Sequence, residues 1–209
     1  MEKDIFKSLF IFLLIMGIST NLNGQIVEKT KLIDIENSNI KWVGEELSGK
    51  NHYGSLKFKS GSLKVEEGKI ISGNFVVDMN TLNVEDLQGG SKQRLEGHLR
   101  SDDFFSVQKF GEAIFEITSP GVLKEDGSSQ ILNGNLTIKG ITNPGKIEVR
   151  CYFSKNCSQL LIDNNWAAKL IFDRSKYDVR FRSGNFFQNL GDKLIYDEIV
   201  ITADISIKK

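Results

Sequence analysis

The stretch IVITADISIK, residues 199–208, places apolar and polar side chains at alternating positions and decides the fold class. Alternation with a period of two is typical of a β-strand with one buried and one exposed face. Similar runs recur along the chain, separated by turn residues at Glu67-Gly68, Asp126-Gly127 and Asn143-Pro144-Gly145. The pattern predicts eight strands, over residues 39–46, 54–66, 69–79, 112–123, 129–139, 146–154, 159–173 and 194–208.

Eight strands that each carry one apolar face must bury those faces together. A closed antiparallel barrel does so and leaves no sheet edge, whereas a two-sheet sandwich is the alternative. The sequence therefore predicts an all-β fold, an eight-stranded antiparallel barrel whose interior is filled by side chains or holds one small ligand. Asn133-Gly134 is interpreted as an irregularity within a strand, because apolar alternation resumes directly after it.

The composition excludes two classes of protein. Across 209 residues, 27 lysines and arginines balance 27 acidic residues, whereas a nucleic-acid-binding protein normally carries a basic excess. Charged residues make up 26% and hydrophobic residues 40% of the chain, which is too apolar for a disordered acidic or basic tail. We therefore expect one folded domain and no nucleic-acid partner.

The first residues have the features of an export signal rather than of a folded domain. The run LFIFLLIMGI, residues 9–18, is apolar throughout, and it is too short for a bilayer-spanning helix, which needs about 20 residues. Small and polar residues follow, so residues 1–24 are interpreted as a signal peptide and residues 25–209 as the mature domain. A buried core helix is the alternative. The interpretation predicts a periplasmic or secreted protein without stable membrane insertion.

Export would place the two cysteines in an oxidising compartment. Cys151 and Cys157 face each other if a hairpin turns near residues 154–156, and a disulfide is then expected. Otherwise Cys151 lies on an apolar strand face and Cys157 in a turn, as independent thiols. The register of the hairpin decides between the two arrangements, and the sequence leaves both open.

Two long segments interrupt the strands, at residues 81–110 and 175–192. In the first, Ser91 is expected to cap a short helix over residues 92–99. The apolar pair Phe104-Phe105 that follows is expected to anchor this segment onto the barrel. A barrel has two open ends, and such helical segments can cover the ends or shape an entrance.

Motifs for nucleotide, phosphate, serine-hydrolase or zinc-protease chemistry are missing from the sequence. His52 and His98 are expected to form separate hydrogen bonds rather than a metal pair. The adjacent Asp102 and Asp103 are expected to cap a helix or form salt bridges. The sequence thus predicts no enzyme, no metal site and no cofactor.

Four stretches of the sequence carry motifs shared with a known family. They are IKWVGEELSGKNHYGSLKFKSGSLKVEEGKIISGNFVVDMNTL (40–82), GHLRSDDFFSVQKFGEAIFEITS (97–119), NGNLTIKGITNP (133–144) and FDRSKYDVRFRSGNFFQNLGDKLIYDEIVI (172–201). Together they resemble the YceI family over nearly the whole of residues 25–209, with its W-x-G at Trp42 and its H-x-G at His52. Gly111 departs from the family, which commonly has proline there, and the cysteine pair is a second departure.

The resemblance implies an exported bacterial protein with a lipocalin-like barrel. It also implies a ligand class, a polyisoprenoid lipid such as a prenyl quinone or a prenyl diphosphate, held by its chain in an apolar cavity. No catalytic residue set comes with the resemblance, and a homodimer is compatible with it. Two alternatives stay open: a stress-response protein with a filled barrel, and an enzyme acting on such a lipid through His98, Arg100, Asp102 and Asp103.

The candidate ligand-binding residues form two groups. Strand alternation predicts that the cavity wall includes Trp42, Phe58, Phe75, Phe115, Leu136, Ile138, Val149, Trp166, Leu170, Ile201 and Ala203. Residues in or beside the two long segments could reach a head group at the barrel mouth, and these are Arg94, His98, Arg100, Arg174 and Arg182. Arginine forks bind anionic groups bidentately, although most exposed arginines are simply solvated.

Overall fold

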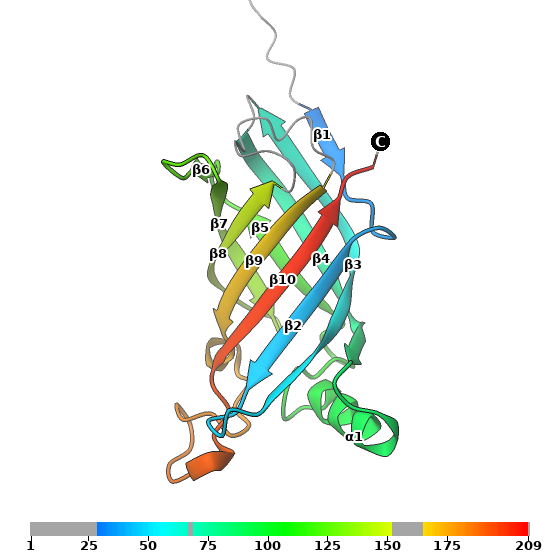
Figure 1. The fold of residues 1–209 in the computed structure, drawn as a ribbon, viewed down its shortest axis with the longest axis vertical. Coiled ribbons are helices and arrows are strands. Elements are labelled where there is room, and N and C mark those ends of the chain that lie inside the picture. The colour runs from blue at the N-terminus through cyan, green and yellow to red at the C-terminus, as the bar shows by residue number, and fades with distance from the viewer. Residues whose placement is uncertain (1–28, 67–68, 152–164, 209) are drawn as a thin grey trace, which may run out of the picture.

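The computed structural model describes residues 29–66, 69–151 and 165–208, which form one sheet that curves into a barrel (Figure 1). The chain order of its elements is β1 (Lys29–Leu32), β2 (Asn39–Glu45), β3 (Asn51–Glu66), β4 (Lys69–Val84), α1 (Gly89–Arg100), β5 (Glu112–Ile117), β6 (Val122–Leu123), β7 (Ser129–Ile138), β8 (Ile141–Cys151), β9 (Asn165–Asp173) and β10 (Glu198–Ser206). Two short 3₁₀ helices, Arg174–Tyr177 and Gly191–Lys193, lie between β9 and β10.

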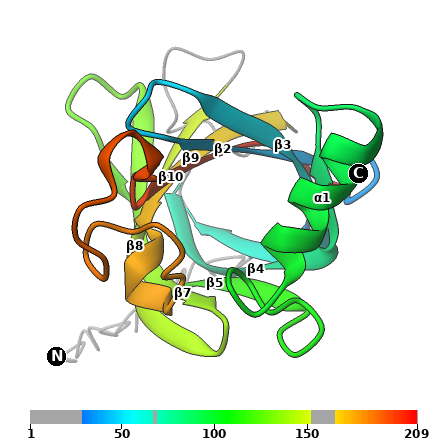
Figure 2. The ribbon, with the colours of Figure 1, turned by 90° about the horizontal axis from the view of Figure 1, so that it is seen from below.

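Among the described residues, eight strands form a closed ring in the order β3-β2-β10-β9-β8-β7-β5-β4, and the pairing of β4 with β3 closes it. Every neighbouring pair in the ring is antiparallel. Figure 2 looks along the axis of this ring. The eight-stranded antiparallel barrel predicted from the alternation is therefore confirmed, and the sandwich alternative is wrong.

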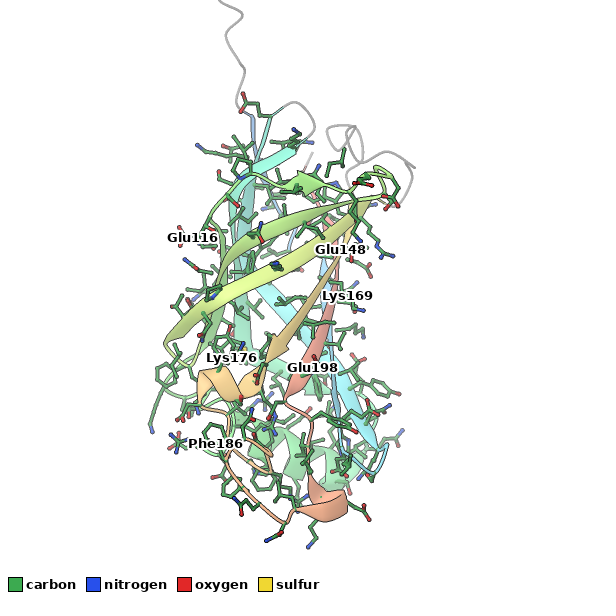
Figure 3. The ribbon with its side chains drawn as sticks, turned by 90° about the vertical axis from the view of Figure 1, so that its left-hand side faces the viewer. Glu116, Glu148, Lys169, Lys176, Phe186 and Glu198 are labelled. Atoms are coloured by element: carbon green, nitrogen blue, oxygen red, sulfur yellow. The ribbon has the colours of Figure 1, made fainter. Side chains whose placement is uncertain are left out.

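Strand alternation separates the two faces of the barrel wall. Phe115 is buried and its neighbour Glu116 is exposed, and in β7 Leu136 is buried between the partly exposed Asn135 and Thr137. Figure 3 shows Glu116, Glu148 and Lys169 on the outer surface of the strands. Every strand of the ring contributes apolar side chains to the inward face, and these form one hydrophobic core.

The barrel has two different ends, which we call the β1 end and the α1 end (Figure 1). At the β1 end, β1 continues the ring beyond β2, because it pairs with residues 62–65 of β3 and a bridge from Ile33 to Ile207 extends the wall. Side chains fill the barrel here. Trp166, Leu132 and Ile70 are fully buried, and the backbone N–H of Ile70 donates to Oε1 of buried Gln130.

Both long segments lie at the α1 end (Figures 1 and 2). This follows from the topology, since consecutive strands of the ring run in opposite directions and every second connection returns to the same end. The connections that follow β2, β4, β7 and β9 therefore share the α1 end. The segment that contains α1 follows β4 and the segment 174–197 follows β9, so they are the second and fourth of these connections. Together they cover one opening of the barrel, rather than one opening each.

One predicted turn is wrong. Asn143-Pro144-Gly145 lies inside β8, and the hairpin turns instead at Lys139-Gly140, where both residues have positive φ angles of 51° and 72°. Such a two-residue turn matches the twist of the strands that it joins. Pro144 is tolerated because β8 pairs with β9 only from Ile147 onward, so no strand on that side needs its missing N–H.

Several element boundaries also differ from the prediction. The strand expected over residues 112–123 breaks after Ile117, because Pro120 lacks a ladder donor and the chain turns before β6. Helix α1 begins at Gly89, so Ser91 is not its N-cap and instead accepts a hydrogen bond from Arg94 at 2.9 Å. Asn133-Gly134 lies within β7, as expected, but its pairing with β5 and β8 runs in unbroken register, so the irregularity predicted there is wrong.

Some predictions fall outside the described residues. The signal peptide, residues 1–24, is one of them, and so is Cys157, the second half of the cysteine pair. The turn at Glu67-Gly68 is a third. These stay predictions.

Candidate functional site

An apolar cavity of about 200 Å³ lies inside the barrel, toward the α1 end. Its wall comes from all eight strands of the ring and from the two segments that cover this end. The strands contribute Ile40, Trp42, Leu56, Phe58, Phe75, Val77, Met79, Leu82, Ala113, Ile114, Phe115, Leu136, Ile138, Ile147, Ala168, Leu170, Phe172, Ile199, Ile201, Ala203 and Ile205. Such a wall offers hydrocarbon contact in every direction and few polar partners.

Two small side chains keep this half of the barrel hollow. Ala203 of β10 stands directly opposite Ala168 of β9, and both border the cavity. One step toward the β1 end, Ile205 stands opposite Trp166, whose large ring is fully buried. The change from alanine pairs to a tryptophan along the same two strands explains where the cavity stops.

The structure places nine of the predicted wall residues on the cavity. These are Trp42, Phe58, Phe75, Phe115, Leu136, Ile138, Leu170, Ile201 and Ala203. Val149 and Trp166 face inward but do not border the cavity, because they belong to the packed core at the β1 end, where they are 1% and 0% exposed. Alternation shows which side chains point inward, and it does not show whether the space between them is filled.

A lid over the α1 end completes the cavity, and strand alternation did not predict it. Leu95 and Leu99 of α1 border the cavity, as do Phe104 and Phe105 just after the helix. Glu96 fixes the helix to the barrel, since its Oε1 accepts a hydrogen bond from the backbone N–H of Val84 at 2.9 Å. The spacing of Leu95 and Leu99, one helical turn apart, is the signal that could have found them.

Phe104 anchors the lid through an aromatic cluster, in agreement with its expected role. Its ring lies 4.9 Å from that of His98, edge-on, and 5.5 Å from that of Phe181 in the other covering segment. The His98 and Phe181 rings are 4.4 Å apart, again edge-on. His98 therefore joins the two covering segments by packing and is not among the cavity-lining residues.

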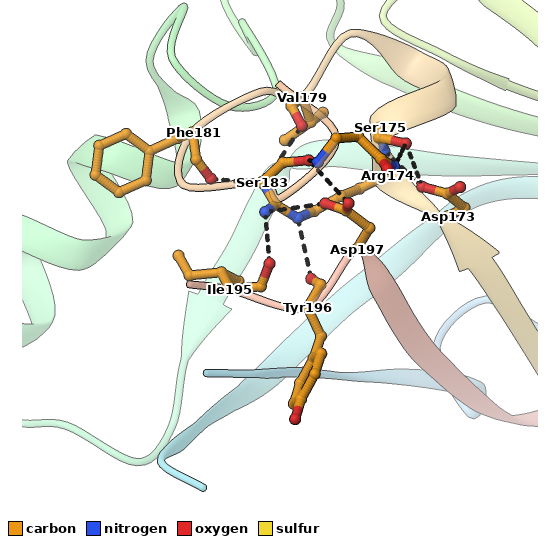
Figure 4. A network of polar contacts seen from close by, with 10 residues as sticks. Asp173, Arg174, Ser175, Val179, Phe181, Ser183, Ile195, Tyr196 and Asp197 are labelled. Atoms are coloured by element: carbon orange, nitrogen blue, oxygen red, sulfur yellow. Dashed lines mark hydrogen bonds and ion pairs between the residues drawn. The ribbon is translucent and has the colours of Figure 1, made fainter. Parts of the chain in front are cut away.

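Arg174, one of the predicted head-group residues, borders the cavity, but its guanidinium is already occupied (Figure 4). The side chain is fully buried and donates hydrogen bonds to four backbone carbonyls, at distances of 2.9 to 3.3 Å. The acceptors are the carbonyl oxygens of Val179, Phe181, Ile195 and Tyr196. Arg174 thus organises the segment between β9 and β10.

The other predicted arginines do not border the cavity. Arg94 is exposed on α1, and Arg100 donates to the backbone carbonyl of Leu82. Arg182 lies over the Phe181 ring, 5.0 Å from its centre. Sequence proximity to the covering segments placed these residues at the correct end of the barrel, but each has a local structural contact and none faces the cavity.

Three other polar residues border the cavity where it approaches solvent, and we call this place the mouth. They are Glu45 and Glu46 at the end of β2 and His52 of β3. Nδ1 of His52 lies 2.6 Å from Oδ2 of Asp86, and Oδ1 of Asp86 accepts the backbone N–H of Tyr53 at 3.1 Å. Burial opposes ionisation of Asp86, but these two hydrogen bonds outweigh it, and the pKa of Asp86 lies below its usual value.

The two histidines have separate partners, as expected: His52 contacts Asp86, and Nε2 of His98 lies 3.5 Å from Oδ2 of Asp103. Asp102 forms the expected salt bridge, with Lys109 at 2.9 Å. Within residues 29–66, 69–151 and 165–208, no cluster of three or more potential metal ligands occurs. In the same ranges, no helix has the length and apolar character needed to cross a membrane.

Fold and cavity together define a class of protein, the closed antiparallel β-barrel with an internal apolar binding space. Residues 32–207 match the model of the YceI-like domain. The chain belongs to this family, as the sequence motifs indicated.

Relatives and solved structures of the same family resemble the chain at low identity. It is 27% identical to a UPF0312 protein of Enterobacter sp. (strain 638) and 26% identical to protein YceI of Salmonella arizonae, in each case over 73% of this chain and 72% of the relative. The crystal structure of Burkholderia cenocepacia BcnA aligns with a TM-score of 0.61 and 16% identity, covering 85% of this chain and 99% of BcnA. A polyisoprenoid binding domain from Saccharophagus degradans aligns with a TM-score of 0.51 and 13% identity, over 85% and 97%.

Proposed function

We propose that this protein binds an isoprenoid lipid and holds the end of its hydrocarbon chain in the barrel cavity. The observation that carries the proposal is the cavity wall, which is apolar on all eight strands and on the lid. A solved structure of the same fold is described as a polyisoprenoid binding domain, and this supports the choice of lipid. Each buried CH₂ group contributes about 0.8 kcal/mol, so chain burial alone gives useful affinity.

The volume of the cavity sets how much of the chain it takes. An engineered protein cavity of about 150 Å³ holds benzene, and by that ratio the cavity of about 200 Å³ holds roughly eight carbon atoms. The terminal isoprene units of a prenyl chain therefore fit, and the rest of the chain runs under the lid toward the mouth. A long polyisoprenoid needs the lid, Leu95, Leu99, Phe104 and Phe105, to move outward.

Tryptophan fluorescence tests binding. Trp42 borders the cavity and Trp166 does not, so titration with farnesol is expected to quench Trp42 alone. A Trp166→Phe variant should retain the quenching, and a Trp42→Phe variant should lose it. Binding in this cavity would be contradicted if the quenching were lost in Trp166→Phe and kept in Trp42→Phe, or if neither variant showed quenching.

The alternative functions have less support. The residues considered for catalysis on a lipid, His98, Arg100, Asp102 and Asp103, do not border the cavity, and the Asp102 and Asp103 side chains are about 70% exposed. A barrel filled by its own side chains describes only the β1 end. Binding of a lipid chain accounts for the hollow α1 end, which a filled barrel would lack.

We propose further that the protein acts outside the cytoplasm, in the periplasm, after removal of residues 1–24. The support is the apolar run at residues 9–18 followed by small and polar residues. N-terminal sequencing of protein from a periplasmic extract tests this. We expect a first residue near Gln25, and an intact Met1 in a cytoplasmic fraction would contradict the proposal.

A further inference from the structure

His52 is placed at the mouth by the same alternation that builds the cavity wall. It lies on β3 two residues before Gly54 and four before Leu56, so its side chain shares their inward face, opposite Gly44 of β2. Its side chain is 19% exposed, and that of its partner Asp86 is 13% exposed. The pair is therefore largely shielded from solvent and stands where a lipid head group would stop.

The partner Asp86 fixes which ring nitrogen carries the proton. An ionised carboxylate only accepts hydrogen bonds, so Nδ1 of His52 must be the donor across the 2.6 Å contact. In the neutral imidazole the other nitrogen, Nε2, is then an acceptor with a free lone pair. No described residue is hydrogen-bonded to this Nε2. The mouth therefore presents an oriented acceptor to a ligand.

The charges around the mouth are unfavourable for an anion. Glu45 and Glu46 border it, and strand alternation turns Glu46, the residue after β2, to the same inward face as Trp42 and Gly44. The positive charge nearest in the wall, Arg174, is paired with Asp197 and surrounded by carbonyl oxygens. A phosphate or diphosphate would meet the like charges of the two glutamates that border the mouth.

We propose that the mouth selects an isoprenoid lipid whose head group is an uncharged hydroxyl, which donates its hydrogen to Nε2 of His52. This rests on the proposed function, because the hydrocarbon chain must occupy the cavity for the hydroxyl to reach the mouth. A hydroxyl satisfies the acceptor, whereas an ether or a quinone carbonyl brings a second acceptor against it. Prenyl alcohols and the reduced, hydroxyl-bearing form of a prenyl quinone belong to the favoured class.

Three probes with the same chain test the proposal: farnesol, farnesyl methyl ether and farnesyl diphosphate. Binding is measured by quenching of Trp42 fluorescence at pH 8. One neutral hydrogen bond is worth about 0.5–1.5 kcal/mol, so farnesol should bind roughly two- to twelvefold more tightly than the ether. The diphosphate should bind more weakly than farnesol. Equal affinity for farnesol and the ether, or tighter binding of the diphosphate, would overturn the proposal and leave lipid binding intact. If none of the three binds, the proposed function itself is wrong.

The variant Asp86→Asn separates a selective role of His52 from a structural one. The amide of the new side chain can still accept the Tyr53 N–H and can donate to Nδ1 of His52. The ring proton then moves to Nε2, which becomes a donor that a hydroxyl and an ether satisfy equally well. We expect the preference for farnesol to disappear and the affinity for the ether to rise, a gain that damage to the fold would not produce. His52→Leu should also abolish the preference, without a gain for the ether. An unchanged preference in both variants would contradict the role of His52.

Discussion

Nη2 of Arg174 lies 3.2 Å from Oδ1 of Asp197, in a position where the arginine side chain has no contact with solvent. Burial lowers the pKa of the guanidinium, and the charges of Asp197 and Asp173 oppose that shift. The pair joins the end of β9 to the start of β10, and the four carbonyls bound by Arg174 lie in the segment between them. This arginine is thus a structural centre of the α1 end.

Replacing Arg174 by methionine should destabilise the protein strongly. The change leaves four carbonyls without the Arg174 donor and leaves the Asp197 carboxylate with Ser183 as its side-chain partner. Breaking a buried pair typically costs about 3–5 kcal/mol. Urea denaturation measures the loss. Arg180→Met is the matched control, because Arg180 is exposed and pairs with Asp178 in the same segment, where about 1 kcal/mol or less is expected. Equal losses in the two variants would contradict the account.

Phe104→Ala should loosen the lid. Phe104 is 7% exposed and contacts both His98 and Phe181, so truncation should cost about 3–5 kcal/mol of unfolding free energy. Phe187→Ala is the control, since Phe187 is 48% exposed and its removal should leave the midpoint of thermal unfolding nearly unchanged. If both variants melt alike, Phe104 does not hold the lid in place.

Replacing either of two glycines by alanine should change the stability of the protein, but in opposite directions. A Cβ on Gly134 would lie 2.3 Å from the carbonyl oxygen of Glu116 and 2.7 Å from the Phe115 ring, so Gly134→Ala must displace the barrel wall. A Cβ on Gly97 of α1 meets nothing within 4 Å, and Gly97→Ala should stabilise the helix by about 0.5–1 kcal/mol. Thermal unfolding of both variants checks the signs, and a stabilising Gly134→Ala would show that the register of β5 and β7 is misplaced.

Glu148 should make stability depend on pH in the acid range. Its carboxylate binds Lys124, Ser129 and Arg150, and these contacts, that with Lys124 foremost, lower its pKa from 4.5 to about 2. Because the pKa is lower in the folded protein, the carboxylate contributes stability above pH 4.5 and loses that contribution as the pH falls toward 2. Wild-type protein should therefore be more stable than Glu148→Gln at pH 7, and the difference should shrink by pH 2.5. A difference that stays constant across this range would exclude the effect.

Most of the barrel could be predicted from the sequence because its signal is local. Alternation places Phe75, Phe115 and Leu170 inward without knowledge of the rest of the chain. The same alternation includes His52, two residues before Gly54, but the strand predicted over residues 54–66 began too late to reveal it. The order of the strands also implies that both covering segments share one end, since they follow strands that run in the same direction.

The features of the site that the sequence did not predict depend on contacts between residues that are distant in the chain. Whether an inward side chain meets a cavity or another side chain is decided across the barrel, as the difference between Ala203 and Trp166 shows. The hydrogen-bond acceptors of the Arg174 side chain lie up to 22 residues away along the chain, and no local pattern indicates that its guanidinium is occupied. Pro144 suggested a turn, because proline lacks the N–H that a central strand needs. The structure keeps Pro144 inside β8, because no neighbouring strand pairs with β8 on that side at this position.

Native mass spectrometry with added farnesol tests most directly whether the cavity holds a lipid chain. Ala203 lies in the hollow part of the wall, so Ala203→Phe should fill the space that the chain needs. Ala167→Phe is the matched control, because Ala167 is the outward neighbour of Ala168 and does not border the cavity. After circular dichroism has shown that both variants are folded, we predict a one-to-one lipid complex for the wild type and for Ala167→Phe, and none for Ala203→Phe. A wild-type protein that carries no lipid, or an Ala203→Phe variant that carries as much as the wild type, would contradict the account.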